Sequence, residues 1–104
     1  MCEGDKMKRV YISGAVTGLP FEEALGAFDE RQRELEVSGY EAVNPVRRAE
    51  VDVAEGSPWE EYMAYDLELL ATCEAISFLP GWEDSRGARL EAAVAKRLGL
   101  EVVQ

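Results

Sequence analysis

Short runs of apolar residues alternate along the chain with longer stretches in which apolar residues recur every three or four positions. The short runs, such as 9–13 and 75–79, are largely apolar rather than alternating, which is typical of strands buried on both faces of a parallel sheet. Each longer stretch carries one apolar stripe, which predicts an amphipathic helix. The pattern predicts strands at 9–13, 40–44, 75–79 and 100–103 and helices at 21–38, 57–72 and 86–98, with a polar loop from Pro45 to Gly56.

This alternation predicts a single α/β domain over residues 1–104, with residues 1–7 expected to be flexible. We expect three layers in a Rossmann-like or flavodoxin-like order, in which a parallel sheet of four or five strands is flanked by helices. Ser57, Pro58 and Glu60 form a predicted capping box at the start of the middle helix. In such sheets ligands bind beyond the carboxyl ends of the strands, which here are the loops at 13–20, 45–57 and 80–86.

The composition is that of an ordinary globular protein, with 47% hydrophobic and 31% charged residues. The net charge is −10 and no sizeable basic patch occurs, which excludes a sequence-independent surface for duplex nucleic acid. No apolar run approaches the ~20 residues of a membrane span, and the first residues do not form a signal peptide. Cys2 and Cys73 favour two reduced thiols in a cytoplasmic protein over a disulfide between them.

The sequence contains no histidine, which excludes Ser-His-Asp and Cys-His catalysis as well as zinc held by histidine. Acid–base chemistry therefore falls to carboxylates, tyrosine, lysine or water. Small anions could still bind locally, because four arginines fall near predicted loops: Arg47, Arg48, Arg86 and Arg89.

The segment from Gly81 to Glu91 carries the strongest functional signal. An apolar strand leads into a turn of small residues, and the turn opens a helix with Glu91 one turn inside it. This arrangement presents backbone N–H groups to an anion and places a carboxylate beside it. Leu90, Val94 and Leu98 are expected to form the apolar face of this helix, and Glu91 lies in an adjacent lane of small residues with Gly87 and Ala95. The alternative is a boundary glutamate paired with a lysine or arginine.

Asp66 lies within an apolar helical stripe that contains Trp59, Met63 and Leu70. A buried carboxylate is costly unless it is paired, so Asp66 either caps a loop or pairs with an arginine, or it points into a cleft. Two carboxylates on different helices at one sheet edge would suit chemistry at the anomeric carbon of a sugar. Tyr11 could orient one of them, although a strand tyrosine can also simply pack.

Aromatic side chains and one glycine loop complete the candidates. Trp59, Tyr62 and Trp82 could stack on a base, with core packing as the alternative. The loop with Gly14 and Gly18 lacks the Gly-Lys-Ser/Thr of a Walker A motif and is weak evidence for a phosphate site.

Several motifs together resemble the nucleoside 2-deoxyribosyltransferase superfamily, and most closely its small bacterial and phage branch. Their order and approximate spacing match that superfamily over nearly the whole chain. The block Ser85-x-Gly87-x-x-x-Glu91 is the most specific of them. The others are Tyr11-Ile12-Ser13-Gly14, Thr17-Gly18-Leu19-Pro20, Val43-Asn44-Pro45, Asp66-Leu67-Glu68-Leu69-Leu70 and Leu79-Pro80-Gly81-Trp82.

The resemblance implies a Rossmann-like domain that cleaves N-glycosidic bonds without a metal or organic cofactor. Glu91 would be the nucleophile that forms a covalent sugar intermediate, Asp66 the general acid or sugar-hydroxyl partner, and Tyr11 the residue that orients the nucleophile. Ser85 matches the deoxynucleoside 5′-monophosphate N-hydrolases, whereas transferases acting on free nucleosides tend to have aspartate there. The expected substrate-binding residues are Ser85, Gly87, Gly14, Arg86, Arg89 and Trp82.

The resemblance also implies a homodimer or a higher homo-oligomer. Members of the superfamily usually continue past the last strand, and in some of them that segment completes a neighbour's pocket. Since this chain ends at Gln104, we expect a more open site or one closed by another element. Besides nucleotide hydrolysis and deoxyribosyl transfer, two non-enzymatic functions stay open: a nucleotide-binding module, and a structural partner in an oligomer.

Overall fold

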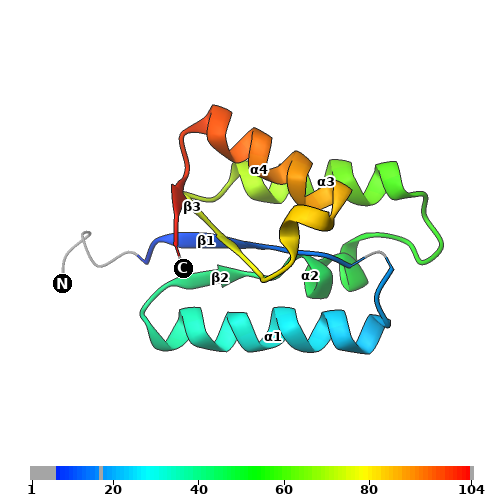
Figure 1. Cartoon of the computed structure of the whole chain (residues 1–104), viewed down its shortest axis with the longest axis horizontal. Coiled ribbons are helices and arrows are strands. Elements are labelled where there is room, and N and C mark those ends of the chain that lie inside the picture. Colours follow the sequence, from blue (N-terminus) through cyan, green and yellow to red (C-terminus); the bar gives the residue numbers. More distant parts are fainter. Residues whose placement is uncertain (1–6, 17, 104) are drawn as a thin grey trace.

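A four-stranded parallel sheet lies between two layers of helices in the computed structural model (Figure 1), which describes residues 7–16 and 18–103. The expectations about residues 1–6, Cys2 and Thr17 lie outside this range. No helix within it is long and apolar enough to cross a membrane. The elements are β1 (Arg9–Ser13), α1 (Phe21–Val37), β2 (Glu41–Val43), α2 (Pro45–Asp52), α3 (Trp59–Ala71), β3 (Ala75–Phe78), the short 3-10 helix η2 (Trp82–Asp84), α4 (Arg86–Leu98) and β4 (Glu101–Val102).

The strand order is β2-β1-β3-β4, which is the beginning of a flavodoxin-like sheet. β1 pairs with β3 from Val10 opposite Ala75 to Ser13 opposite Phe78, and with β2 on its other side. The chain therefore leaves β1 for one side of the sheet and later returns to the other side. The crevice between the ends of β1 and β3 is the topological switch point, where ligands bind in folds of this kind.

Each face of the sheet is covered by its own apolar core. On one face Phe28 and Leu35 of α1 pack against Val10 and Ile12 of β1. On the other face Leu70 of α3 and Ala95 of α4 pack against one residue from each of three strands: Tyr11, Val43 and Ile76. Because strand side chains alternate between faces, Tyr11 and Ser13 both point towards α3 and α4.

The prediction of a loop from Pro45 to Gly56 is wrong for its first part, because residues Pro45–Asp52 form α2. Asn44 caps this helix, since its side-chain oxygen accepts a hydrogen bond from the Arg47 N–H at 3.3 Å. Pro45 then stands in the first turn, where proline is favoured, rather than only ending a strand. The Asn44 amide also bonds Asp29 and Gln32 of α1, so partners distant in sequence fix the cap.

Two further predictions about helices are also wrong. Ser57 does not cap α3, because its hydroxyl turns back and donates to the Ala54 carbonyl at 2.6 Å, and the helix begins after Pro58. In the predicted apolar face of α4 only Val94 packs against the core, whereas Leu90 is 40% and Leu98 51% exposed. The lane of small residues packs inward instead, since small side chains let a helix approach closely; the buried residues of α4 are Ala88, Glu91 and Ala95.

Candidate functional site

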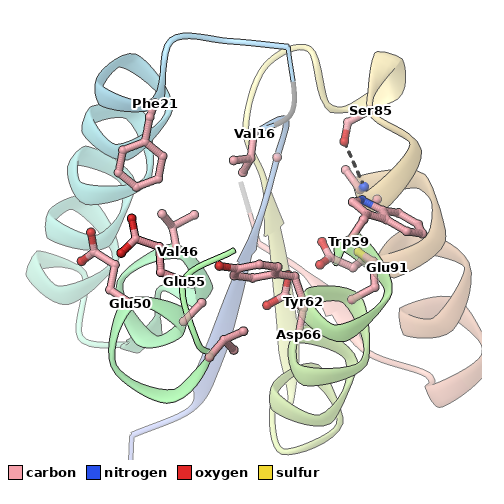
Figure 2. Close-up of a pocket in the computed structure, with 16 residues that line it drawn as sticks. Val16, Phe21, Val46, Glu50, Glu55, Trp59, Tyr62, Asp66, Ser85 and Glu91 are labelled. Carbon is pink, nitrogen blue, oxygen red and sulfur yellow. Dashed lines mark hydrogen bonds between the residues drawn. The ribbon is translucent and has the colours of Figure 1, made fainter. Parts of the chain in front are cut away.

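A cavity of about 650 Å³ opens at the switch point between β1 and β3, in the size range of small-ligand sites. Figure 2 shows Ser85, Trp59, Glu91 and Asp66 at one end and Phe21, Val46, Glu50 and Glu55 at the other. The lining residues come from four helices and three connecting segments: Gly14, Val16, Phe21, Val46, Ala49, Glu50, Val53, Glu55, Trp59, Tyr62, Met63, Asp66, Ser85, Gly87, Ala88 and Glu91.

Glu91 lines this cavity from α4 and is only 5% exposed. Its two oxygens are held from the sheet side. The Tyr11 hydroxyl donates to Oε2 and the Ser13 hydroxyl donates to Oε1, each at 2.7 Å. Burial raises the pKa of Glu91 above its usual range, while the two hydroxyl donors favour the charged form and pull the pKa back. The predicted pairing of Tyr11 with a carboxylate is present in the structure, and within the described part of the chain Glu91 forms no ion pair with a lysine or arginine.

Among the site residues that the sequence analysis did not single out, Ser13 is the one that hydrogen-bonds Glu91. It is 1% exposed and ends β1 two residues after Tyr11, on the same face of the sheet. The signal available was a hydroxyl residue in an otherwise apolar strand, spaced by two from a tyrosine. That signal gives the face but not the partner, because the partner lies on α4.

Asp66 lines the same cavity from α3, as the cleft interpretation predicts. Burial, and next the negative charge of Glu91, raise its pKa to about 7. No side-chain hydrogen bond contributes to this pKa. Asp66 is therefore about half protonated near neutral pH, whereas Glu91 has two hydroxyl donors that stabilise its charge. The pKa values of both carboxylates are raised by burial, and Asp66, which has no donor that favours its charged form, is the better placed of the two to carry and release a proton near neutral pH.

Ser85 caps α4 and lies beside the cavity. Its Oγ accepts a hydrogen bond from the Ala88 N–H at 3.1 Å, drawn as the dashed line in Figure 2. The Ser85 hydroxyl proton is left to donate, and the N–H groups of Arg86 and Gly87 belong to the first turn, which has no partners inside the helix. Gly87 also allows α3 to pack closely, since a Cβ there would lie 3.1 Å from Met63 Sδ.

Gly14 brings the two loops of the switch point together. A Cβ at this position would lie 2.8 Å from Leu79 Cδ1 and 2.9 Å from Leu79 Cβ. Glycine therefore allows the chain leaving β1 to contact the chain leaving β3. Gly81 then turns the chain that leaves β3 into η2. Its φ of 85° lies in the left-handed region, which residues with a side chain rarely adopt.

The remaining predicted binding residues lie around the cavity rather than on its wall. The Arg86 guanidinium stacks over the Trp59 ring, 4.2 Å from its centroid, and Trp59 itself lines the cavity. Arg89 donates from Nη1 to the Glu83 carbonyl at 2.8 Å. Trp82 stacks on Phe78, with ring centroids 4.3 Å apart. Neither Arg89 nor Trp82 lines the cavity. Of these three residues only Arg86 contacts a lining residue, namely Trp59.

Two of the other candidates are also placed by the structure. Tyr62 lines the cavity beside Trp59, so both aromatic rings could contact a planar ligand. Arg47 is engaged elsewhere, because it forms an ion pair with Asp29 at 2.6 Å.

The charged residues that line the cavity are all acidic: Glu50, Glu55, Asp66 and Glu91. These carboxylates repel an anion. A ligand anion would therefore be accommodated only at the Ser85 end of the cavity, where the first turn of α4 and Arg86 offset the negative potential. Within residues 7–16 and 18–103 no group of three or more cysteine and carboxylate side chains is placed to hold a metal ion.

Residues 8–104 match the family described as a domain of unknown function, DUF4406, and the chain belongs to this family. No curated protein matches the chain.

Proposed function

We propose that this protein hydrolyses the N-glycosidic bond of a nucleoside 5′-monophosphate, or transfers its deoxyribosyl group, through a sugar bound covalently to Glu91. The observation that carries the proposal is the state of Glu91: it is buried, it faces the cavity, and both of its oxygens are fixed by hydroxyl donors. The proposal agrees with the resemblance of Tyr11–Gly14 and Ser85–Glu91 to the nucleoside 2-deoxyribosyltransferase superfamily.

In the first step an oxygen of Glu91 would bond to the anomeric carbon as the bond from that carbon to the base nitrogen breaks. Asp66 would give its proton to the departing base, which leaves neutral. In the second step water, or a second base in the transferase, would attack the same carbon and lose a proton to Asp66, and the Glu91 carboxylate would be released. Two displacements at one carbon retain its configuration.

The rest of the cavity suits the other parts of a nucleotide. The phosphate would lie against the Ser85 hydroxyl and the first N–H groups of α4, with Arg86 nearby. The base would contact Trp59, at the same end of the cavity as Glu91, and Tyr62, which lies between the two ends (Figure 2).

To test this proposal, the protein is incubated with a panel of ribo- and deoxyribonucleoside monophosphates and the free base is followed by chromatography. We expect base release by the wild type and by Glu68→Gln, which changes an exposed glutamate on the same helix as Asp66. Release should fall at least ~10³-fold in Glu91→Gln, because a neutral amide cannot form the intermediate. Equal release by wild type and Glu91→Gln for every substrate would contradict the proposal.

A second candidate function is non-catalytic binding of a nucleotide or nucleotide derivative. The observation that favours it is that each Glu91 oxygen already accepts a hydrogen bond, which lowers its reactivity as a nucleophile. In this case Glu91 would only accept a sugar hydroxyl. Calorimetry would then detect nucleotide binding without base release, and Glu91→Gln would bind as well as the wild type.

The proposal includes a cytoplasmic homodimer or higher oligomer. It is supported by Cys73, which forms no disulfide within residues 7–16 and 18–103, and by exposed apolar side chains on α4 and the edge strand β4: Leu90, Leu98 and Val102. Sedimentation velocity over a range of concentrations would test the oligomeric state, and a monomer at all concentrations would contradict it.

A further inference from the structure

We infer that Ser13 is a positioning residue that fixes which oxygen of Glu91 attacks the sugar, an inference that rests on the proposed function. Neither the motif resemblance nor the family match assigns Ser13 a role. Its hydroxyl lies 2.7 Å from Glu91 Oε1, and both side chains are at least nine-tenths buried. The hydrogen bond therefore forms away from solvent, where it is strong and where the loss of either partner is costly.

The direction of the Ser13 side chain is set by its backbone. The Ser13 carbonyl accepts a hydrogen bond from the Leu79 N–H at 2.8 Å, and Ser13 pairs with Phe78 at the end of the β1–β3 ladder. Gly14 follows at once and packs against Leu79. Because the pairing with β3 fixes the Ser13 backbone, the hydroxyl can change its position only by rotation about the Cα–Cβ bond.

Tyr11 and Ser13 together determine the orientation of the carboxylate. They are spaced by two along one strand and each holds a different oxygen of Glu91, so rotation of the carboxylate would break both hydrogen bonds. Ser13 is nearer the carboxyl end of β1, and the next residue, Gly14, lines the cavity. Oε1, which Ser13 holds, is thereby the oxygen nearer the ligand edge of the sheet, and Oε2 lies deeper with Tyr11.

Ser13 also influences how protons are shared between the two carboxylates. Its hydroxyl favours the charged form of Glu91, which lowers the Glu91 pKa against the effect of burial. Asp66 has no such donor acting on its pKa. The same hydrogen bond that orients Glu91 thus favours its charged form, as the proposed chemistry requires.

The test compares Ser13→Ala with Ser77→Ala, a matched control within the same sheet. Ser77 is also fully buried near the end of a strand, but it belongs to the opposite face, where it accepts a hydrogen bond from Arg31 Nη1 at 2.7 Å. Both changes remove one buried hydroxyl, and only one of them touches Glu91. Ser13→Thr keeps the hydroxyl and serves as the conservative variant.

In Ser13→Ala we expect kcat to fall by about 10- to 100-fold with KM changed by less than about threefold, because the nucleophile is misaimed rather than lost. The acidic limb of the pH profile of kcat/KM should move to higher pH, since Glu91 loses a donor to its charged form. Ser13→Thr should recover most of kcat, and Ser77→Ala should change neither kcat nor the limb. A Ser13→Ala variant that matches Ser77→Ala in both measurements would overturn the inference.

Titration of the Glu91 carboxylate by ¹³C NMR separates this inference from the proposed function, because it needs no turnover. A higher midpoint in Ser13→Ala, and an unchanged one in Ser77→Ala, supports the control of Glu91 by Ser13. An unchanged midpoint in Ser13→Ala overturns it. If the wild type releases no base from any nucleotide, the proposed function fails, and with it the assignment of Oε1 as the attacking atom.

Discussion

Tyr11 and Glu91 lie 80 positions apart in the sequence, and the Tyr11 hydroxyl donates a 2.7 Å hydrogen bond to Glu91 Oε2. Tyr11 is fully buried in β1, and burial, followed by the charge of Glu91, raises its pKa well above the usual range. Tyr11 therefore stays neutral and remains a hydrogen-bond donor at every pH at which the protein is expected to work. This relationship links the core of the sheet to the carboxylate in the cavity.

Tyr11→Phe should lower both stability and activity. The change keeps the ring that packs in the core but leaves one oxygen of a buried carboxylate without its donor, at a cost of about 1–3 kcal/mol in the free energy of unfolding. Chemical denaturation measures this cost. Tyr65→Phe is the control, because the Tyr65 hydroxyl bonds Asp52 nearer the surface, where water can replace it. An equal loss in the two variants would contradict the importance of the Tyr11–Glu91 bond.

The pH dependence of stability should reveal Asp66. Its pKa is about 7 in the folded protein and near 3.8 in the unfolded chain, so the folded state binds more protons between these values. The contribution of Asp66 to the free energy of unfolding therefore falls as pH rises from about 4 to 7, and it is fully lost above pH 7. Asp66→Asn removes the effect and should be more stable than the wild type at pH 8, by on the order of 2–4 kcal/mol. Equal stabilities at pH 8 would contradict a partly buried Asp66 whose pKa is raised.

The activity should follow a bell-shaped pH profile with its basic limb near pH 7. Asp66 must carry a proton to protonate the departing base, so kcat/KM should decline as Asp66 ionises. Initial rates of base release between pH 4 and 9 measure the profile. In Asp66→Asn the remaining activity should lack the basic limb, and a limb that persists there would assign it to another group.

Ser85→Asp should separate phosphate binding from binding of the nucleoside. Aspartate can cap α4 as serine does, so the helix is expected to remain folded. Its charge would repel the phosphate, and we expect affinity for a nucleoside 5′-monophosphate to fall at least ~10-fold while affinity for the nucleoside is kept. Calorimetry with Glu91→Gln as the background prevents turnover during the measurement. An equal loss for both ligands would place the phosphate elsewhere.

Gly14→Ala should destabilise the switch point. The new Cβ would lie within 2.9 Å of two Leu79 atoms, one of them the Leu79 Cβ, which cannot move aside without the backbone. We expect a loss of about 1–3 kcal/mol. Gly26→Ala is the matched control, since it lies in α1 with open space around it and should stabilise the protein by about 0.5–1 kcal/mol. Thermal unfolding that ranked the two variants in the opposite order would contradict this packing.

The order of the strands and of every α-helix except α2, the parallel sheet and the position of the cavity at the carboxyl ends of the strands could be predicted from the sequence. These features follow from local periodicity and from general rules of chain connection. Ser85, Glu91 and Asp66 could be proposed as site residues on the same basis, because each stands out within its own segment. Local pattern decides what a segment can be.

The tertiary structure decided which partners these residues have. α2 escaped prediction because Asn44 is held by Asp29 and Gln32 of another helix, and no local pattern records those bonds. The inward side of α4 was misjudged because burial depends on how closely the helix approaches the sheet, and small residues approach closest. Likewise, Ser13 meets Glu91 only through the pairing of β1 with β3 and the packing of α4 above them. The raised pKa of Asp66 has the same origin, since burial and the charge of Glu91 act through space and not along the chain.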